Sequence, residues 1–429
     1  MFRRLAAILL CATLQAAPVL ADDSGLKDVA KTIAVVRATR GANTDRDAGP
    51  ELTPVKHALR KWIEQSLEGA PTDMRNGPDA GRLKALSSRL SRTLKIADLT
   101  CDTAKPGKDR CSGDPNSPTF DARGYVTGVN LTYLNEGRYL LVETGVGVLC
   151  GFDSSAYIYE ARDGHWRLLL QTEQDSYDKN YAPQNFLSVT VSPANVGWNE
   201  PAPQPPLVLT LGYSPWCASN WQAIYTRLWR ATPNNPSPKP LIDTSDELYM
   251  GDDGVAAENL TDRDVLIQFR GRSIDGGLLV RPVVRHYLVE DHDQVERVAP
   301  IALQPSDFVD EWLSDDWRDA AKWSALTGRS TAVAQWHKYI HRHFLFGEFD
   351  DQPTRCKADP TLWQVGYTLS EGLKDDPHPE ISAHFLVRWM APYSFTMVDV
   401  KADKFPGCDQ VVDQPDDLGT LFPVDDWRR

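Results

Sequence analysis

The sequence lacks a long uncharged apolar segment after its first 21 residues, and this absence excludes a helical membrane span in the rest of the chain. It also lacks a Gly-x-Ser-x-Gly motif, a P-loop and a Cys-x-x-Cys pair, which are signatures of α/β-hydrolases, nucleotide-binding loops and structural zinc sites. Basic residues are outnumbered, since 46 Lys and Arg stand against 59 Asp and Glu. This acidic balance argues against a nucleic-acid-binding role.

The 429 residues are otherwise those of a folded protein with two or three structural units. At the N-terminus, Arg3 and Arg4 precede an apolar run from Leu5 to Leu14, and small residues follow up to Ala21. This pattern predicts a secretory leader that is cleaved after Ala21. The mature protein is therefore expected in the periplasm or outside the cell, with 44 basic residues against 59 acidic ones.

Seven cysteines are present, and cleavage of the leader would remove Cys11. The remaining six are an even number, which predicts three disulfides in an oxidising compartment. The segment between the first two of them is rich in Pro, Gly and Asp and suits a short closed loop. The expected pairs are Cys101 with Cys111, Cys150 with Cys217, and Cys356 with Cys408.

Two amphipathic helices are expected near the N-terminus, because apolar residues recur at helical spacing over residues 53–68 and 79–97. The stretch 53–97 contains nine basic and four acidic residues, so it is basic within an acidic chain. Such a surface suits docking on an anionic lipid or polymer. Contact with the acidic remainder of the same protein is the favoured interpretation.

From residue 125 onward the apolar pattern alternates with a period of two, which predicts β-strands. The turn Arg162-Asp163-Gly164 is a strong hairpin signal between two of them. The strands fall into three successive groups of four. The expected ranges are 125–134, 138–145, 156–161 and 165–172; 186–192, 207–213, 223–230 and 240–244; and 255–260, 265–270, 283–290 and 295–303.

These groups predict a mainly β fold of repeated four-stranded antiparallel units, arranged as a propeller-like array or as a sandwich. Strand-like runs at 361–370 and 383–400 would supply a further unit. Helices are expected over 307–313, 315–326 and 331–344, with Ser306, Ser314 and Ser330 as their N-caps. The expected division of the chain is a leader (1–21), an N-terminal helical segment (22–100), a repeated β domain (101–305), a helical insertion (306–346) and a C-terminal β segment with an acidic tail (347–429).

The third strand group carries a cluster of candidate ligand-binding residues. Several converging guanidinium groups would clamp a carboxylate or a phosphate. The favoured alternative is that these arginines pair with acidic neighbours within the protein. The candidates are Arg270, Arg272, Asp275, Arg281, Arg285 and His286.

His337 and His341 are four residues apart on an expected helix, so they share one face and are candidates for a common metal ion. The glutamate that follows the first histidine in many zinc hydrolases is missing. Histidines near a helix C-terminus are also stabilised by the helix dipole without any metal. The sequence assigns no cofactor.

Thirteen tryptophans would allow stacking on sugars, with Trp198, Trp216 and Trp221 as the best placed, although packing between sheets is the commoner cause. Because no catalytic constellation stands out, the function expected is that of a non-enzymatic binding or scaffold protein. Its partner would be an anionic small molecule, a glycan or an envelope protein. The competing hypothesis is a hydrolase of envelope glycans or esters.

Overall fold

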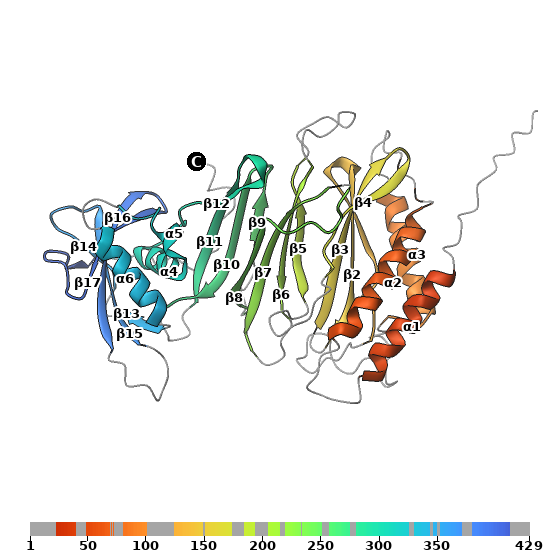
Figure 1. Ribbon diagram of the computed structural model, residues 1–429, viewed down its shortest axis with the longest axis horizontal. Coiled ribbons are helices and arrows are strands. Elements are labelled where there is room, and N and C mark those ends of the chain that lie inside the picture. Colours follow the sequence, from red (N-terminus) through yellow and green to blue (C-terminus); the bar gives the residue numbers. More distant parts are fainter. Residues whose placement is uncertain are drawn as a thin grey trace, which may run out of the picture.

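The computed structural model shows a mainly β protein in which successive strands pair into antiparallel sheets (Figure 1). The N-terminal segment 1–22, with the expected leader, lies outside the residues that the structure describes. The described residues are 23–39, 49–68, 70, 72, 80–100, 124–148, 151–173, 184–193, 205–214, 219–232, 234–250, 257–274, 280–325, 330–343, 346–349, 352–370 and 380–411.

Three four-stranded sheets follow one another along the chain, and each pairs its strands in sequence order. They correspond to the three strand groups expected from the sequence, which confirms the repeated four-stranded units. The first sheet contains β1 (Asn130–Leu134), β2 (Tyr139–Val148), β3 (Gly151–Arg162) and β4 (His165–Gln171); the second β5 (Asn185–Val191), β6 (Leu207–Tyr213), β7 (Trp221–Arg230) and β8 (Ile242–Tyr249); the third β9 (Ala257–Leu260), β10 (Asp264–Arg272), β11 (Val280–Val289) and β12 (Val295–Arg297).

The sheets stand face to face in chain order along the longest axis of the molecule (Figure 1). Alternate residues of one strand therefore enter different cores. Leu140 and Val142 of β2 face the N-terminal helices, whereas Tyr139 and Leu141 face the second sheet. Because side chains alternate between the two faces of a strand, a sheet covered on both sides needs a nearly continuous apolar run. This explains why β2 is buried along almost its whole length.

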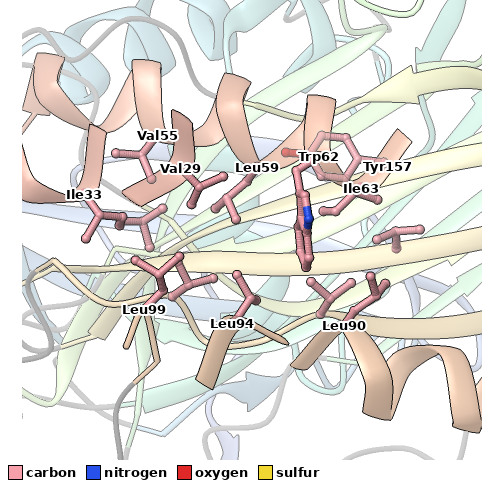
Figure 2. Packing of buried hydrophobic residues seen from close by; sticks show 14 of the residues in the cluster. Val29, Ile33, Val55, Leu59, Trp62, Ile63, Leu90, Leu94, Leu99 and Tyr157 are labelled. Carbon is pink, nitrogen blue, oxygen red and sulfur yellow. The ribbon is translucent and has the colours of Figure 1, made fainter. Parts of the chain in front are cut away.

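The N-terminal helices cover the outer face of the first sheet and share one hydrophobic core with it (Figure 2). They are α1 (Asp23–Thr39), α2 (Gly49–Leu67) and α3 (Ala80–Ile96), of which α2 and α3 confirm the two expected helices. Helix α1 was not among the expected helices, and four of its apolar residues are β-branched and favour helices weakly. Burial of Val29 and Ile33 against α2 and α3 compensates for this low propensity.

Two basic residues of α2 contact acidic residues that lie in the first sheet or directly after it. Lys56 Nζ lies 2.9 Å from Asp153 Oδ2, and both side chains are buried. Arg60 Nη1 lies 2.6 Å from Glu173 Oε2. For α2 this confirms that basic charge in the stretch 53–97 rests on the acidic body of the same protein.

The C-terminal part combines three helices with a six-stranded sheet. The helices are α4 (Pro305–Ser314), α5 (Trp317–Ala320) and α6 (Ser330–His343). The sheet has the order β17-β16-β15-β14-β18, and β13 also pairs with β15. Its strands are β13 (Phe346–Phe349), β14 (Thr354–Arg355), β15 (Leu362–Ser370), β16 (Ile381–Ala391), β17 (Ser394–Lys401) and β18 (Gln410–Val411).

Several expectations for this part were wrong. Helix α4 begins at Pro305 after Gln304, so Ser306 lies inside the helix and is not its N-cap. The helix expected over 315–326 is reduced to the four residues of α5, whose N-cap is Asp316, and Ser314 is the last residue of α4. Ser330 is the first residue of α6 and does not precede it. The chain instead exchanges backbone hydrogen bonds with β17: Met397 N donates to Trp323 O, and Ala325 N donates to Met397 O.

The structure joins Cys356 to Cys408 by a disulfide, which confirms the third expected pair. The other four cysteines, Cys101, Cys111, Cys150 and Cys217, lie outside the described residues, so their pairing stays a prediction. Within the described part of the chain, no helix is long and apolar enough to cross a membrane.

Candidate functional site: a polar cleft beside helix α3

A cleft of about 470 Å³ lies where α3 meets the first two sheets. Its walls come from α3, from β1 and the residues before it, from β2 and β3, and from the start of β5. This volume falls within the range of small-molecule binding sites. The lining residues are Ser87, Ser91, Thr127, Gly128, Val129, Asn130, Glu143, Thr144, Ser154 and Phe186.

Five of these residues carry hydroxyl groups, and several hydroxyls donate their protons to the backbone. Ser87 Oγ donates to Val129 O at 2.7 Å, and Thr144 Oγ1 donates to Gly128 O at 2.8 Å. Thr127 Oγ1 donates to the same Gly128 oxygen at 3.3 Å. A hydroxyl that donates inward keeps oxygen lone pairs for a proton from a ligand, so these walls are rich in acceptors.

An amide and a carboxylate lie side by side in the cleft. Asn130 and Glu143 are register partners on β1 and β2, and Asn130 Nδ2 donates to Glu143 Oε2 at 3.2 Å. The pair therefore presents both donors and acceptors within a few ångströms. Phe186, at the start of β5, supplies the aromatic side chain of the lining.

Gly128 fits the cleft because of its backbone conformation. Its φ of +112° is one that residues with a side chain rarely adopt, and a Cβ atom there would lie 3.4 Å from Ser91 Oγ. A side chain at this position would also enter the space between α3 and β1.

Basic residues of α3 flank the cleft. Lys84 is three residues before Ser87, and Lys95 is four residues after Ser91, so each lies near a cleft-lining serine on the helix surface. Both lysines are exposed. These lysines place positive charge beside the cleft, whereas the lining itself carries the negative charge of the Glu143 carboxylate.

The candidate anion-binding residues of the third sheet do not share one face. Arg281 and Arg285 pair in register with Gly271 and Ile267, and therefore point to the side of the second sheet. His286 alternates with Arg285 and lies on the opposite face, where its Nε2 is 2.9 Å from Asp264 Oδ1.

Two more members of the set also lie apart from the buried arginines. Arg270 belongs to the opposite face with His286. Arg272, at the end of β10, is half-exposed, with its Nε 3.0 Å from Glu247 Oε2. Asp275 lies outside the described residues.

Arg281 and Arg285 are neutralised by carboxylates of α4 and β8. Arg281 Nη2 lies 2.6 Å from Glu311 Oε2, and Arg285 Nε lies 3.0 Å from Glu311 Oε1. Arg285 also pairs with Asp246, and Arg297 of β12 contacts Glu311 at 2.8 Å. An external anion would have to displace these carboxylates, so the contacts favour pairing within the protein. Ligand binding by the six candidate residues of the third strand group stays a prediction.

Within this buried network, the pKa of Glu311 is lowered and the pKa of Asp307 is raised. Burial alone would raise the pKa of Glu311, but Arg285, Arg281 and Arg297 hold it well below its usual range. Burial raises the pKa of Asp307 to about 7, against the opposing effect of Arg281. The network joins the third sheet to α4, and it lies apart from the polar cleft.

His337 and His341 both contact the C-terminal end of α4. His337 Nε2 lies 2.9 Å from Trp312 O, and His341 Nδ1 lies 2.9 Å from Leu313 O. Because a carbonyl oxygen only accepts, these two nitrogens carry protons and are not ligands. In the described part of the chain, no group of three or more His, Cys, Asp or Glu residues is placed to hold a metal ion. The metal site stays a prediction without further structural evidence.

The tryptophan candidates are only partly described, since Trp198 and Trp216 lie outside the described residues. Trp221 packs against Tyr249, with the ring centroids 5.2 Å apart, and Arg272 lies over its ring. Both contacts are internal, so Trp221 is explained by packing between the second and third sheets.

A second cavity of about 380 Å³ lies beside the disulfide, and Gln364 and His384 contribute to its lining. Gln364 is buried and already bonded: its Oε1 accepts from Phe405 N at 2.5 Å. The polar cleft at α3 has the larger volume and is the better candidate for a ligand.

Sequence reasoning missed the cleft residues. Ser87 and Ser91 lie on an amphipathic helix and belong to no recognisable sequence motif. Asn130 and Glu143 are separated by 13 positions and meet only because β1 and β2 pair. A polar residue on each of two adjacent expected strands was the one available signal.

No family model matches the chain, and no curated protein matches it. Among solved structures, an α-L-arabinofuranosidase from Fusarium graminearum with an iminosugar inhibitor aligns at a TM-score of 0.25 and 8% identity, over 67% of this chain and 69% of that one. A xylan β-1,4-xylosidase from Bacillus halodurans aligns at 0.15 and 10%, over 71% and 52%. Neither likeness identifies a shared fold or activity.

Proposed function

We propose that this protein binds a neutral saccharide, or a similar polyhydroxylated ligand, in the cleft beside α3 without converting it. The observation that carries the proposal is the composition of the lining: hydroxyl groups, one amide–carboxylate pair and one aromatic ring. Sugars present hydroxyl donors together with apolar ring faces, which these groups match.

The charges around the cleft favour a neutral ligand. Glu143 in the lining would repel an anion, whereas Lys84 and Lys95 of α3 would repel a cation that approaches along this helix. A ligand without formal charge meets neither penalty.

The lining also favours binding without catalysis. Most glycoside hydrolases use two carboxyl groups that flank the scissile bond. Among the described residues of this lining, Glu143 is the only carboxylate. The disulfide between Cys356 and Cys408 suits an oxidising compartment, so we place the binding protein in the periplasm or outside the cell.

The test is isothermal titration calorimetry of the mature protein with maltohexaose, cellohexaose, xylohexaose and chitohexaose. We expect at least one of these neutral oligosaccharides to bind. The double variant Asn130→Ala/Glu143→Gln should weaken that binding about tenfold or more, because it removes the paired donors and acceptors. Product analysis after incubation should find the oligosaccharide intact.

The matched control is Glu258→Gln in the third sheet. Glu258 is likewise hydrogen-bonded between strands, to Thr190 Oγ1 at 2.8 Å, but it lies outside the cleft. Its substitution should leave oligosaccharide binding unchanged. The proposal fails if none of the four oligosaccharides binds, if spermidine binds in their place, or if the cleft variant binds as tightly as the wild type.

A further inference from the structure

The turn between β16 and β17 exposes five consecutive residues that carry no charge. They are Trp389, Met390, Ala391, Pro392 and Tyr393, and we call them the apolar tip. Met390 is 60% exposed and Trp389 is 45% exposed, values that are large for such side chains. A contiguous exposed group of this kind marks an interaction site more often than scattered apolar residues do.

The apolar tip is exposed on both sides of its sheet. Trp389 pairs in register with Phe395, on the face that packs against α4, whereas Ala391 pairs with Ser394 on the other face. Met390 lies at the register shift between these two pairs. The turn therefore projects beyond the packed layers, and a partner that covers only one face would leave apolar surface in water.

The backbone of the apolar tip is held in place. Trp389 N donates to Thr361 O at 2.8 Å, and Ala302 N donates to Tyr393 O at 3.0 Å. Tyr393 has a φ of +63°, a left-handed conformation that costs a side-chain-bearing residue about 1 kcal/mol and that glycine would adopt freely. Tyr393 is 41% exposed, so this fixed backbone conformation keeps part of an aromatic side chain at the surface.

The part of the hairpin nearest the apolar tip contains no acidic residue, although the protein as a whole is acidic. Over residues 381–398 there is no Asp or Glu, and Arg388 is the single Lys or Arg. We propose that the apolar tip inserts into the interfacial layer of a lipid bilayer. Tryptophan and tyrosine have an apolar ring with a polar group and accumulate at this layer, and lipid surrounds a projecting turn on both faces. This inference is independent of the saccharide cleft.

The test is co-sedimentation of the mature protein with sucrose-loaded phosphatidylcholine vesicles, with and without a quarter of phosphatidylglycerol. We expect binding to both compositions, because apolar insertion does not require anionic lipid. The double variant Trp389→Ser/Met390→Ser should weaken binding about tenfold or more. Both side chains are exposed, so the variant should keep the wild-type unfolding temperature.

The matched control is Ile96→Ser on α3, because Ile96 is 79% exposed and lies far from the hairpin in sequence. It should bind vesicles like the wild type. The proposal is overturned if the wild type does not sediment with vesicles, or if the tip variant binds equally well. It is also overturned if binding requires phosphatidylglycerol and is lost in Lys84→Ser/Arg92→Ser, or if light scattering shows that the tip holds two copies of the chain together.

Discussion

Glu311 of α4 and Arg281 of β11 form a 2.6 Å ion pair in which both side chains are almost completely buried. The same carboxylate also contacts Arg285 and Arg297, so one acidic side chain lies between three guanidinium groups. This contact joins the third sheet to the helices of the C-terminal part. Asp310, Asp246 and Asp315 contribute further ion pairs to the same three arginines, and Glu311 is the carboxylate that all three share.

Glu311→Gln should therefore lower the free energy of unfolding by about 3–5 kcal/mol, because it leaves buried positive charge uncompensated. Urea denaturation monitored by circular dichroism measures this loss. The control is Glu247→Gln, which breaks the half-exposed pair with Arg272 and should cost less than about 1 kcal/mol. Equal losses in the two variants would contradict the assigned role of Glu311.

The raised pKa of Asp307, about 7, predicts a specific pH dependence. The folded state binds a proton at Asp307 more tightly than the unfolded state, in which the pKa of this carboxyl is close to the ordinary value of 3.8. The stability contributed by the protonated carboxyl is therefore lost as the pH rises from about 4 through 7. Asp307→Asn should remove this loss, so its unfolding free energy should change less between pH 5 and 8.

Urea denaturation of the wild type and Asp307→Asn at pH 5, 6, 7 and 8 measures this difference. The exposed Asp163→Asn in the hairpin turn serves as the control and should keep the wild-type profile. The lowered pKa of Glu311 has the opposite effect on the free energy of unfolding. The stability that ionised Glu311 contributes is lost only as the pH falls below the pKa of this residue in the unfolded state. Parallel profiles of wild type and Asp307→Asn would show that Asp307 does not titrate as assigned.

The disulfide between Cys356 and Cys408 closes a loop with a sequence separation of 52. In the chain-entropy model, a loop of this length stabilises the folded state by about 4 kcal/mol. Cys356→Ala/Cys408→Ala should lose a comparable amount, because alanine suits two buried positions. Urea denaturation measures the loss, and peptide mapping without reduction checks the pairing. A peptide that links Cys150 to either residue would contradict it.

His337→Ala should destabilise the protein by about 1–3 kcal/mol, because it leaves the buried carbonyl of Trp312 without its donor. His343→Ala, exposed at the end of the same helix, should have little effect on the unfolding free energy. Zinc content after dialysis, measured by mass spectrometry, addresses the metal hypothesis in parallel. A lower zinc content in His337→Ala/His341→Ala than in the wild type would favour a metal site over hydrogen bonding to α4.

The sequence predicted the elements that repeat a simple period. The alternation of apolar residues located all twelve strands of the first three sheets, and helical spacing located α2 and α3. The positions of α4 and α6 were predicted from expected serine N-caps. Prediction from periodicity failed at α1 and around α5, where the intrinsic helix propensity of the residues and their tertiary contacts favour different structures. In both places the contacts decided: α1 is buried against α2, and residues 323–325 bond to β17.

The candidate sites show the same division more strongly. The sequence by itself determined that arginines cluster in the third strand group and that two histidines share a helix face. Only the tertiary structure decided that Arg281 and Arg285 meet the carboxylate of Glu311, and that Asn130 meets Glu143 in a cleft. The physical reason is that periodicity is a local property of the sequence, and it shows only which face of a helix or strand a side chain occupies. A site forms only when elements that are distant in sequence pack together.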